Sequence, residues 1–182
     1  MLRSRGFTLI EILVVMVIIA VISAGAILSL SSIGRDTQLE DETRRLATLI
    51  NYAREQAELQ TREMGLFCRE DGYRFLVFDP RRNLWVDIGN DETLRARTLP
   101  AGLNLRLTVE AQEVVLESTA NAKTIQPQDL QPHVMIFSNG DLTSFKVAMA
   151  REGSDRTITL APDDQGRVTT DEVKPPAAGS GA

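Results

Sequence analysis

Residues 7–34 contain a single charged side chain, Glu11, and this apolar block constrains the fold more than any other feature of the chain. A helix of about 20 apolar residues, at 1.5 Å per residue, crosses a bilayer core of roughly 30 Å. Arg3 and Arg5 precede the block, which places the N-terminus in the cytoplasm and the remaining chain outside. The sequence therefore predicts a transmembrane helix over 7–34.

An ordinary secretory signal peptide is the alternative interpretation, since residues 24–26 read Ala-Gly-Ala, like a cleavage site. Two observations argue against it: apolar residues continue past Ala26, and Glu11 lies inside the segment. A carboxylate at that depth costs about 2.5–3.5 kcal/mol on insertion scales, so Glu11 is expected to have a functional partner.

The chain after residue 34 is acidic, with 18 basic and 24 acidic residues and a formal charge of −6. Such a body has no overall attraction for nucleic acid.

One cysteine, Cys68, and one histidine, His133, exclude an internal disulfide and a Cys/His zinc site. We expect Cys68 to be buried rather than paired between chains, and His133 to be structural. No nucleophile-elbow, zincin, Walker or C-x-x-C pattern is present, so we expect no catalytic residue, metal or cofactor. A membrane-tethered enzyme is an alternative without a supporting motif.

The segment 35–64 is predicted to be an amphipathic helix that continues the apolar one, and Gly65 is predicted to end it. Its apolar residues recur with helical spacing: Leu46, Leu49, Ile50, Ala53 and Ala57. Opposite charges four residues apart are predicted to pair: Glu40 with Arg44, Asp41 with Arg45, and Glu58 with Arg62. Gly25 and Gly34 suit either a bend or close packing against another helix.

Residues 65–173 are predicted to form an antiparallel β domain, followed by a disordered tail over 174–182. Three hairpins are predicted: 66–70 with 73–79 around Asp71-Gly72, 133–138 with 142–150 around Asn139-Gly140, and 157–161 with 167–170. Residues 103–109 alternate apolar and polar side chains, as a half-buried strand does, and 119–132 is predicted to be a loop. The fold class is α+β: a long N-terminal helix, transmembrane and then amphipathic, packed on an antiparallel sheet domain.

The run Gly6-Phe7-Thr8-Leu9-Ile10-Glu11 resembles the class III signal of type IV pilins and type II secretion pseudopilins. The resemblance implies that a prepilin peptidase/N-methyltransferase removes residues 1–6 as a leader, cutting between Gly6 and Phe7, and methylates the new amino group of Phe7. The apolar helix then stays as a single inner-membrane anchor, with the N-terminus cytoplasmic and the C-terminal domain periplasmic.

Glu11 lies four residues after Phe7, so both are on one helix face. In a helical filament its carboxylate is suited to neutralise the amino terminus of a neighbouring subunit and to fix the register between subunits. An ion pair within one subunit and a protonated glutamate are the alternatives.

The run Phe137-Ser138-Asn139-Gly140-Asp141, leading into the strand at 142–149, resembles the H-type minor pseudopilins of type II secretion, whose pilin-like domain is shared with FimT- and FimU-like minor pilins. Ser138 departs from the proline often found there. The resemblance implies a noncatalytic pseudopilus subunit that links a tip complex of I, J and K types to the major pseudopilin and aids export of folded proteins; secreted proteins are further candidate partners. A type IV minor pilin for adhesion or DNA uptake is the alternative, although acidic residues outnumber basic ones over 152–174.

Five arginines in neighbouring predicted loops and strands form a candidate surface for an acidic partner, with a solvated face as the alternative: Arg81, Arg82, Arg95, Arg97 and Arg106. The single tryptophan, Trp85, is predicted to lie in the core, or otherwise to anchor an interface.

Overall fold

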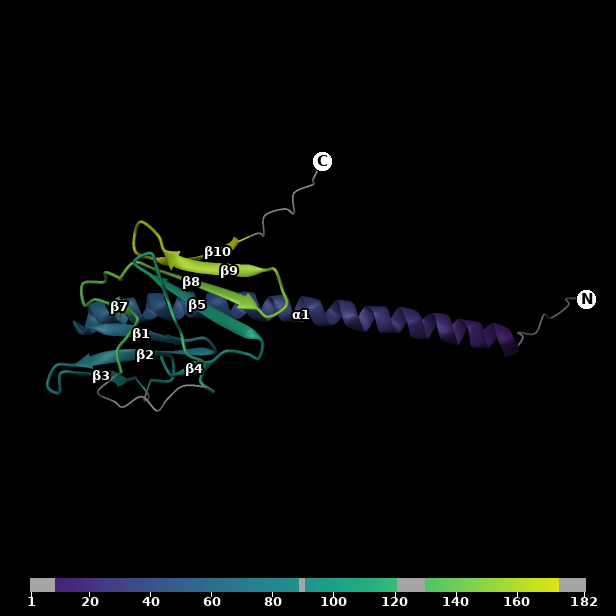
Figure 1. Cartoon of the computed structure of the whole chain (residues 1–182), viewed down its shortest axis with the longest axis horizontal. Coiled ribbons are helices and arrows are strands. Elements are labelled where there is room, and N and C mark those ends of the chain that lie inside the picture. The colour runs from purple at the N-terminus through teal and green to yellow at the C-terminus, as the bar shows by residue number, and fades with distance from the viewer. Residues whose placement is uncertain (1–8, 89–90, 121–129, 174–182) are drawn as a thin grey trace, which may run out of the picture. The chain divides into compact units, whose positions relative to one another are not determined.

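The predicted helical region is one α-helix, α1 (Leu9–Gln60), which passes through Gly25 and Gly34 without interruption. The computed structural model describes residues 9–88, 91–120 and 130–173, without the side chains of 24–36 (Figure 1). The chain divides into two units between Gln38 and Leu39. The predicted leader with Gly6, Phe7, most of the 119–132 loop and the predicted tail at 174–182 lie outside the described residues.

The helix ends at Gln60, earlier than predicted, and Gly65 does not end it. Thr61 takes the left-handed conformation with φ of 50°, and its N–H donates to Glu58 O at 3.2 Å. The next N–H, of Arg62, donates to Ala57 O at 3.1 Å, which completes a Schellman motif. Gly65 lies within a strand, where a Cβ atom would come 2.4 Å from Cβ of Pro132. The Pro132 ring packs against the backbone at this position, and that contact, rather than helix termination, explains the glycine.

The strands form two antiparallel sheets. The first sheet has the order β3 (Leu84–Asp87), β2 (Gly72–Asp79), β1 (Met64–Arg69), β7 (Val134–Ile136), with β4 (Arg97–Thr98) also on β2. The second has the order β10 (Val168–Val173), β9 (Thr157–Pro162), β8 (Phe145–Arg151), β5 (Leu103–Val109), β6 (Gln112–Val114). The predicted α+β class is confirmed.

Two predicted hairpins are confirmed and one is wrong. β1 pairs with β2 and β9 with β10, across the predicted turns. The segments flanking Asn139-Gly140 instead enter different sheets, because β7 pairs with β1 whereas β8 pairs with β5 and β9. Among the described residues, the two flanking segments pair with each other only through an isolated bridge between Ile136 and Leu142. The turn is therefore a crossover from one sheet to the other.

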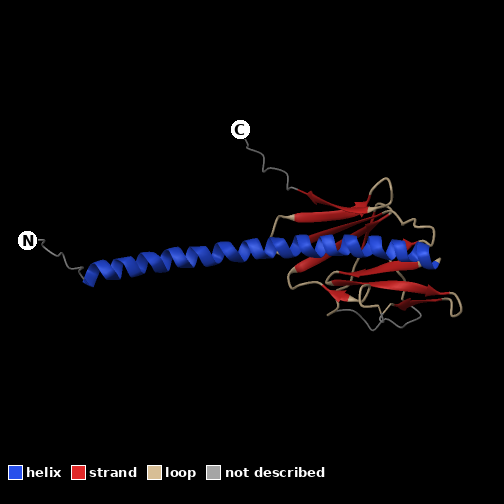
Figure 2. Cartoon of the chain, turned by 180° about the vertical axis from the view of Figure 1, so that it is seen from behind, coloured by secondary structure: helices blue, strands red, loops and turns tan. Residues whose placement is uncertain are grey.

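The second part of α1 lies across both sheets and shares one core with them (Figure 2). All five predicted stripe residues are buried: Leu46, Leu49, Ile50, Ala53 and Ala57. The stripe also includes Leu39 and Thr43. The Thr43 hydroxyl donates a hydrogen bond to Leu39 O at 2.7 Å, so this polar group has a partner inside the core.

The predicted i,i+4 ion pairs are wrong: the described residues contain none of the three. Glu42 pairs with Arg45 at 2.7 Å, and Arg54 with Glu58 at 3.6 Å. Glu40 instead bonds Arg156, which also pairs with Glu172 at 2.6 Å. Tertiary contact with a guanidinium from the loop before β9 replaces the local pair for Glu40.

Candidate functional site

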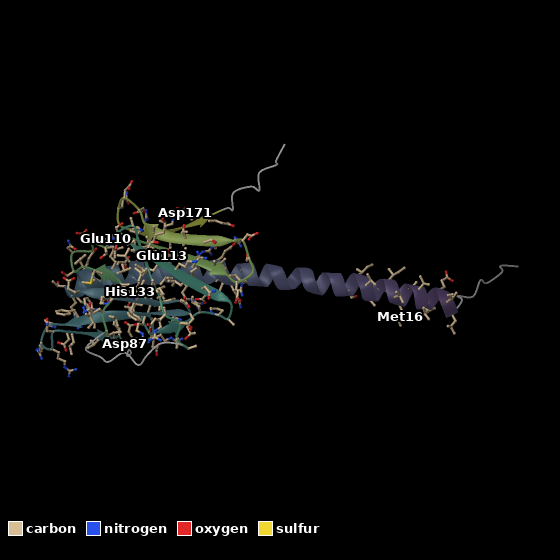
Figure 3. All side chains as sticks on the ribbon, in the orientation of Figure 1. Met16, Asp87, Glu110, Glu113, His133 and Asp171 are labelled. Carbon is tan, nitrogen blue, oxygen red and sulfur yellow. The ribbon has the colours of Figure 1, made fainter. Side chains whose placement is uncertain are left out.

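Within the first unit, the described side chains from Leu9 to Ile22 are apolar around the whole circumference of the helix, apart from Glu11 (Figure 3). Between Leu9 and Ile22 the exposed fraction of the large hydrophobic side chains runs from 44% at Val15 to 85% at Leu9. A helix that is apolar on all sides is typical of a segment covered by lipid or by other helices. This segment is therefore built to be buried against something other than its own unit.

Glu11 lies in the first turn of α1 and is exposed. A carboxylate in that position interacts favourably with the positive end of the helix dipole. Its predicted partner, the amino group of Phe7, falls outside the described residues, as does the predicted cleavage site. The role of Glu11 stays a prediction here.

No helix in the part of the chain that the structure describes has both the length and the apolar character of a membrane span. Residues 24–34 of the predicted span at 7–34 have side chains that the structure does not describe.

The five predicted partner-surface arginines do not form one cluster. Arg81 and Arg82 lie in the turn after β2, where Arg82 pairs with Asp79 at 3.7 Å. Arg97 lies on β4 opposite Tyr73, at the far end of β2, about 20 Å away at 3.3 Å per residue. Arg95 is exposed just before β4. Arg106 belongs to β5 in the other sheet.

Trp85 is half-buried and lies outside the core cluster of the described residues, so the prediction of a core position is wrong. It sits on β3 directly opposite Phe78 of β2, with ring centroids 5.3 Å apart. Because Trp85 pairs with Phe78 outside the core, the alternative prediction, that Trp85 anchors an interface, stays open.

Cys68 and His133 are structural neighbours. Cys68 is 1% exposed, as predicted, and burial raises the pKa of its thiol to about 12. Its backbone N–H donates to Nδ1 of His133 at 3.1 Å, and the imidazole stacks on the ring of Phe67 at 4.7 Å. Burial lowers the pKa of His133, which favours the neutral ring that can accept this hydrogen bond.

The Phe137–Asp141 segment forms one wall of an open groove of about 1110 Å³ at the C-terminal end of α1. Gly140 N–H donates to Phe137 O at 2.9 Å, and Ser138 Oγ donates to Oε1 of Glu63 at 3.1 Å. A proline at position 138 lacks the hydroxyl that makes the second bond. The motif therefore ties the crossover between the sheets to the short link between α1 and β1.

Two arginines that the sequence analysis did not select lie beside Arg97. Arg69 and Arg74 flank the β1–β2 turn and, with Arg97, line one small cavity. Their alternation with Phe67 along the hairpin places them on one face, which is the signal that could have identified them. Arg97 belongs to β4, a two-residue strand with no sequence pattern of its own, and its position opposite Tyr73 directs its side chain to the other face of the sheet.

Comparisons with known proteins agree over most of the chain. A profile described as "Type II transport protein GspH" matches residues 42–166, and one described as "Prokaryotic N-terminal methylation motif" matches residues 1–27. Type II secretion system protein H of Pseudomonas aeruginosa is 35% identical, over 90% of this chain and 93% of that protein. The protein of the same name from Aeromonas hydrophila is 25% identical, over 91% and 92%.

Solved structures share the fold. The minor pseudopilin EpsH of the Vibrio cholerae type II secretion system superposes with a TM-score of 0.61 at 18% identity, over 76% of this chain and 97% of that one. The solution structure of Escherichia coli GspH gives a TM-score of 0.52 at 20% identity, over 75% and 88%. Of the two filament classes that the sequence left open, the relatives support type II secretion. The chain belongs to the GspH family of type II secretion proteins, the H-type minor pseudopilins.

Proposed function

We propose that this protein is a noncatalytic subunit of the periplasmic pseudopilus that links the tip complex of I, J and K types to the major pseudopilin and so aids export of folded proteins. Family membership supports the subunit role. The position below the tip, and contact with secreted proteins, rest on the resemblance alone.

The observation that carries the proposal is the apolar surface of Leu9–Ile22, which is exposed on all sides in the isolated chain. In the inner membrane before assembly, and among neighbouring helices after it, that surface is covered. We assign residues 1–6 as a leader that the prepilin peptidase removes, with Phe7 as the methylated N-terminal residue, and 7–34 as the anchor and polymerisation helix. Residues 35–64 continue it into a periplasmic β domain.

Glu11 supplies the specificity of this contact. Its carboxylate is the single negative charge in an apolar segment, so an unpaired state is unfavourable in lipid. Pairing with the N-methylated amino group of Phe7 on a neighbouring subunit lets the two opposite charges neutralise each other in the apolar environment and selects one axial register.

The test uses two substitutions at Glu11 in the full-length chain. Glu11→Leu and Glu11→Gln are both expected to insert and to be processed at Phe7, which mass spectrometry of the N-terminal peptide measures. Both are expected to enter pseudopili poorly, measured as the amount that copurifies with the major pseudopilin in sheared filaments.

The glutamine variant separates charge pairing from the protonated-glutamate alternative, because an amide replaces a neutral carboxyl group well and a carboxylate badly. Glu55→Gln, at an exposed glutamate on the same helix, is the matched control and should assemble normally. Normal assembly of Glu11→Leu would contradict the proposed role of Glu11 in pseudopilus assembly.

A further inference from the structure

A row of side chains crosses the first sheet at the end where β1 begins. Trp85 of β3 lies opposite Phe78 of β2, and the N–H of Phe78 donates to Glu63 O at 2.9 Å, which extends the pairing of β1 with β2 by one residue. Directly paired residues of neighbouring strands point to the same face of a sheet, so these three side chains lie side by side. Ser138, in the segment after β7, joins the row by donating through Oγ to Oε1 of Glu63 at 3.1 Å.

The row is aromatic and only half-buried. The rings of Phe78 and Trp85 are 5.3 Å apart, and neither residue belongs to the core cluster of the described residues. Phe137, the residue before Ser138, is 39% exposed. We call these three aromatic residues, together with Glu63, the Glu63 row. Aromatic side chains grouped at a protein surface are enriched at interfaces with other proteins.

Glu63 supplies the row with a carboxylate that is satisfied on one side only. Its Oε1 accepts from Ser138, whereas its Oε2 is buried and has no hydrogen-bond partner in the part of the chain that the structure describes. A buried carboxylate oxygen without a donor is unfavourable, so a cation that supplies the donor gains free energy. Rotation about the last side-chain bond exchanges the two oxygens, so the half-buried residue can present the oxygen that Ser138 does not hold.

The adjoining groove has the sign of charge that suits a cationic partner. The groove extends from Glu63 along the Phe137–Asp141 segment, and its lining includes five acidic residues and one basic residue, Arg54. That arginine is already engaged, since it pairs with Glu58 at 3.6 Å. A positively charged side chain from a partner therefore meets an excess of negative charge beside aromatic rings.

We propose that the Glu63 row binds an arginine of the pseudopilin that lies on its tip side in the pseudopilus. The inference rests on the proposed function and names the chemistry of one of its contacts. A guanidinium group both pairs with a carboxylate and stacks on aromatic rings, so arginine suits the row better than lysine. Glu63 follows the last helical residue, Gln60, by three positions. In a filament anchored through the N-terminal ends of its helices, the C-terminal end of α1 is the end toward the tip, which favours a tip-side subunit over the major pseudopilin.

The first experiment measures affinity between the full-length chain in detergent micelles and each of the other pseudopilins of its own secretion system. Glu63→Gln removes the charge but keeps an oxygen that accepts from Ser138, so a purely structural role predicts unchanged binding. The proposal predicts instead at least about tenfold weaker binding to the tip-side partner. Glu70→Gln, at an exposed glutamate just past the other end of β1, is the matched control and should bind like the wild type.

The aromatic part of the row is tested in the same assay. Phe137→Ala removes an exposed ring and should also weaken the tip-side complex by at least about tenfold. An unchanged unfolding midpoint shows that the variant is folded. Val115→Ala shortens another exposed apolar residue, next to the second sheet, and is the control that should bind normally.

The second experiment identifies the arginine. Each exposed arginine of the bound pseudopilin is replaced by glutamine in turn and tested against the wild type and against Glu63→Gln. One such substitution should weaken binding to the wild type by at least about tenfold and binding to Glu63→Gln by much less, because both substitutions remove the same contact. Lysine at that position of the partner should restore binding only in part.

The outcomes separate the two proposals. If the wild type binds a pseudopilin and both Glu63→Gln and Phe137→Ala bind it equally well, the row proposal is overturned while the subunit role stands. Weaker binding to the major pseudopilin alone also overturns it, as does the absence of any partner arginine whose effect depends on Glu63. If the wild type binds none of the pseudopilins, the proposed function fails and takes the row proposal with it.

Discussion

Asn51 of α1 makes both hydrogen bonds that the backbone of Val168 offers at the edge of the second sheet. The Asn51 Nδ2 donates to Val168 O at 2.9 Å, and Val168 N–H donates to Oδ1 of Asn51 at 2.9 Å. β10 is the terminal strand of that sheet in the order that the structure describes, so this side of Val168 has no strand partner. A helix side chain thus takes the place of a neighbouring strand and fixes α1 to the sheet.

We predict that Asn51→Ala lowers the free energy of unfolding by about 2–3 kcal/mol, because two hydrogen bonds are lost and two backbone groups are left unpaired. Denaturant unfolding of the full-length chain in detergent, followed by circular dichroism of the β domain, measures this. Thr48→Ala removes an exposed hydroxyl that bonds only within the helix and should change stability by less than about 0.5 kcal/mol. Equal midpoints for the two variants would contradict the assigned role of Asn51.

The Cys68 thiol is predicted to be unreactive in the folded protein. Because burial raises its pKa to about 12, almost no thiolate exists at pH 8, and reagents also have no access. A thiol reagent should therefore label Cys68 only after denaturation. Val115→Cys is a suitable positive control, since position 115 is 92% exposed and a cysteine there should react at once in the native state. Rapid labelling of the wild type without denaturant would show that the first sheet opens around Cys68.

The sequence patterns that predict the structure correctly are those set by local geometry. Leu46, Ile50 and Ala57 recur with the helical period, and Leu103–Val109 alternates with the period of a strand, so each pattern follows from which face is buried. The Asp71-Gly72 hairpin is also local, because its turn residues bring the two strands together.

The failures share a different cause, which is that distant contacts decided the outcome. The chain around Asn139-Gly140 has the composition of a hairpin, yet β7 is taken by β1 and β8 by β5. Glu40 likewise pairs with Arg156, from the loop before β9, and not with the nearby Arg44. None of these pairings has a signature within a short window of sequence.

His133 should make the stability of the β domain depend on pH. Burial lowers its folded pKa below the ordinary value of about 6.5, so the unfolded chain binds the proton more readily. The contribution of His133 is therefore complete above about pH 6.5. It is lost as the pH falls from there through the lower folded pKa, because the protonated ring cannot accept the Cys68 N–H at Nδ1.

The matching variant is His133→Asn, whose Oδ1 can accept the same hydrogen bond without titrating. It is expected to be less stable than the wild type at pH 8, because it lacks the ring that stacks on Phe67, but to lose less stability between pH 8 and pH 5. Carboxylates such as Asp71 titrate below this window and affect both proteins alike. Unfolding free energies at the two pH values measure the difference, and identical losses in both proteins would exclude His133 as the titrating group.

Gly140 is required by two separate constraints, and a second glycine separates them. Gly140 has a φ of +84°, and a Cβ atom there would lie 1.8 Å from Oε1 of Glu58. Gly153 has a similar φ of +75° with nothing within 4 Å of its would-be Cβ, so Gly153→Ala reports the backbone strain alone, about 1 kcal/mol. We predict that Gly140→Ala costs about 1–3 kcal/mol of unfolding free energy, more than Gly153→Ala. The additional loss of unfolding free energy in Gly140→Ala, compared with Gly153→Ala, should disappear when Glu58→Ala is added. The effect of Glu58→Ala by itself is subtracted first. Denaturant unfolding of the three single variants and the double variant measures these free energies. If the double variant recovers nothing, contact with Glu58 is not what restricts position 140, and strain in the crossover turn is the whole effect.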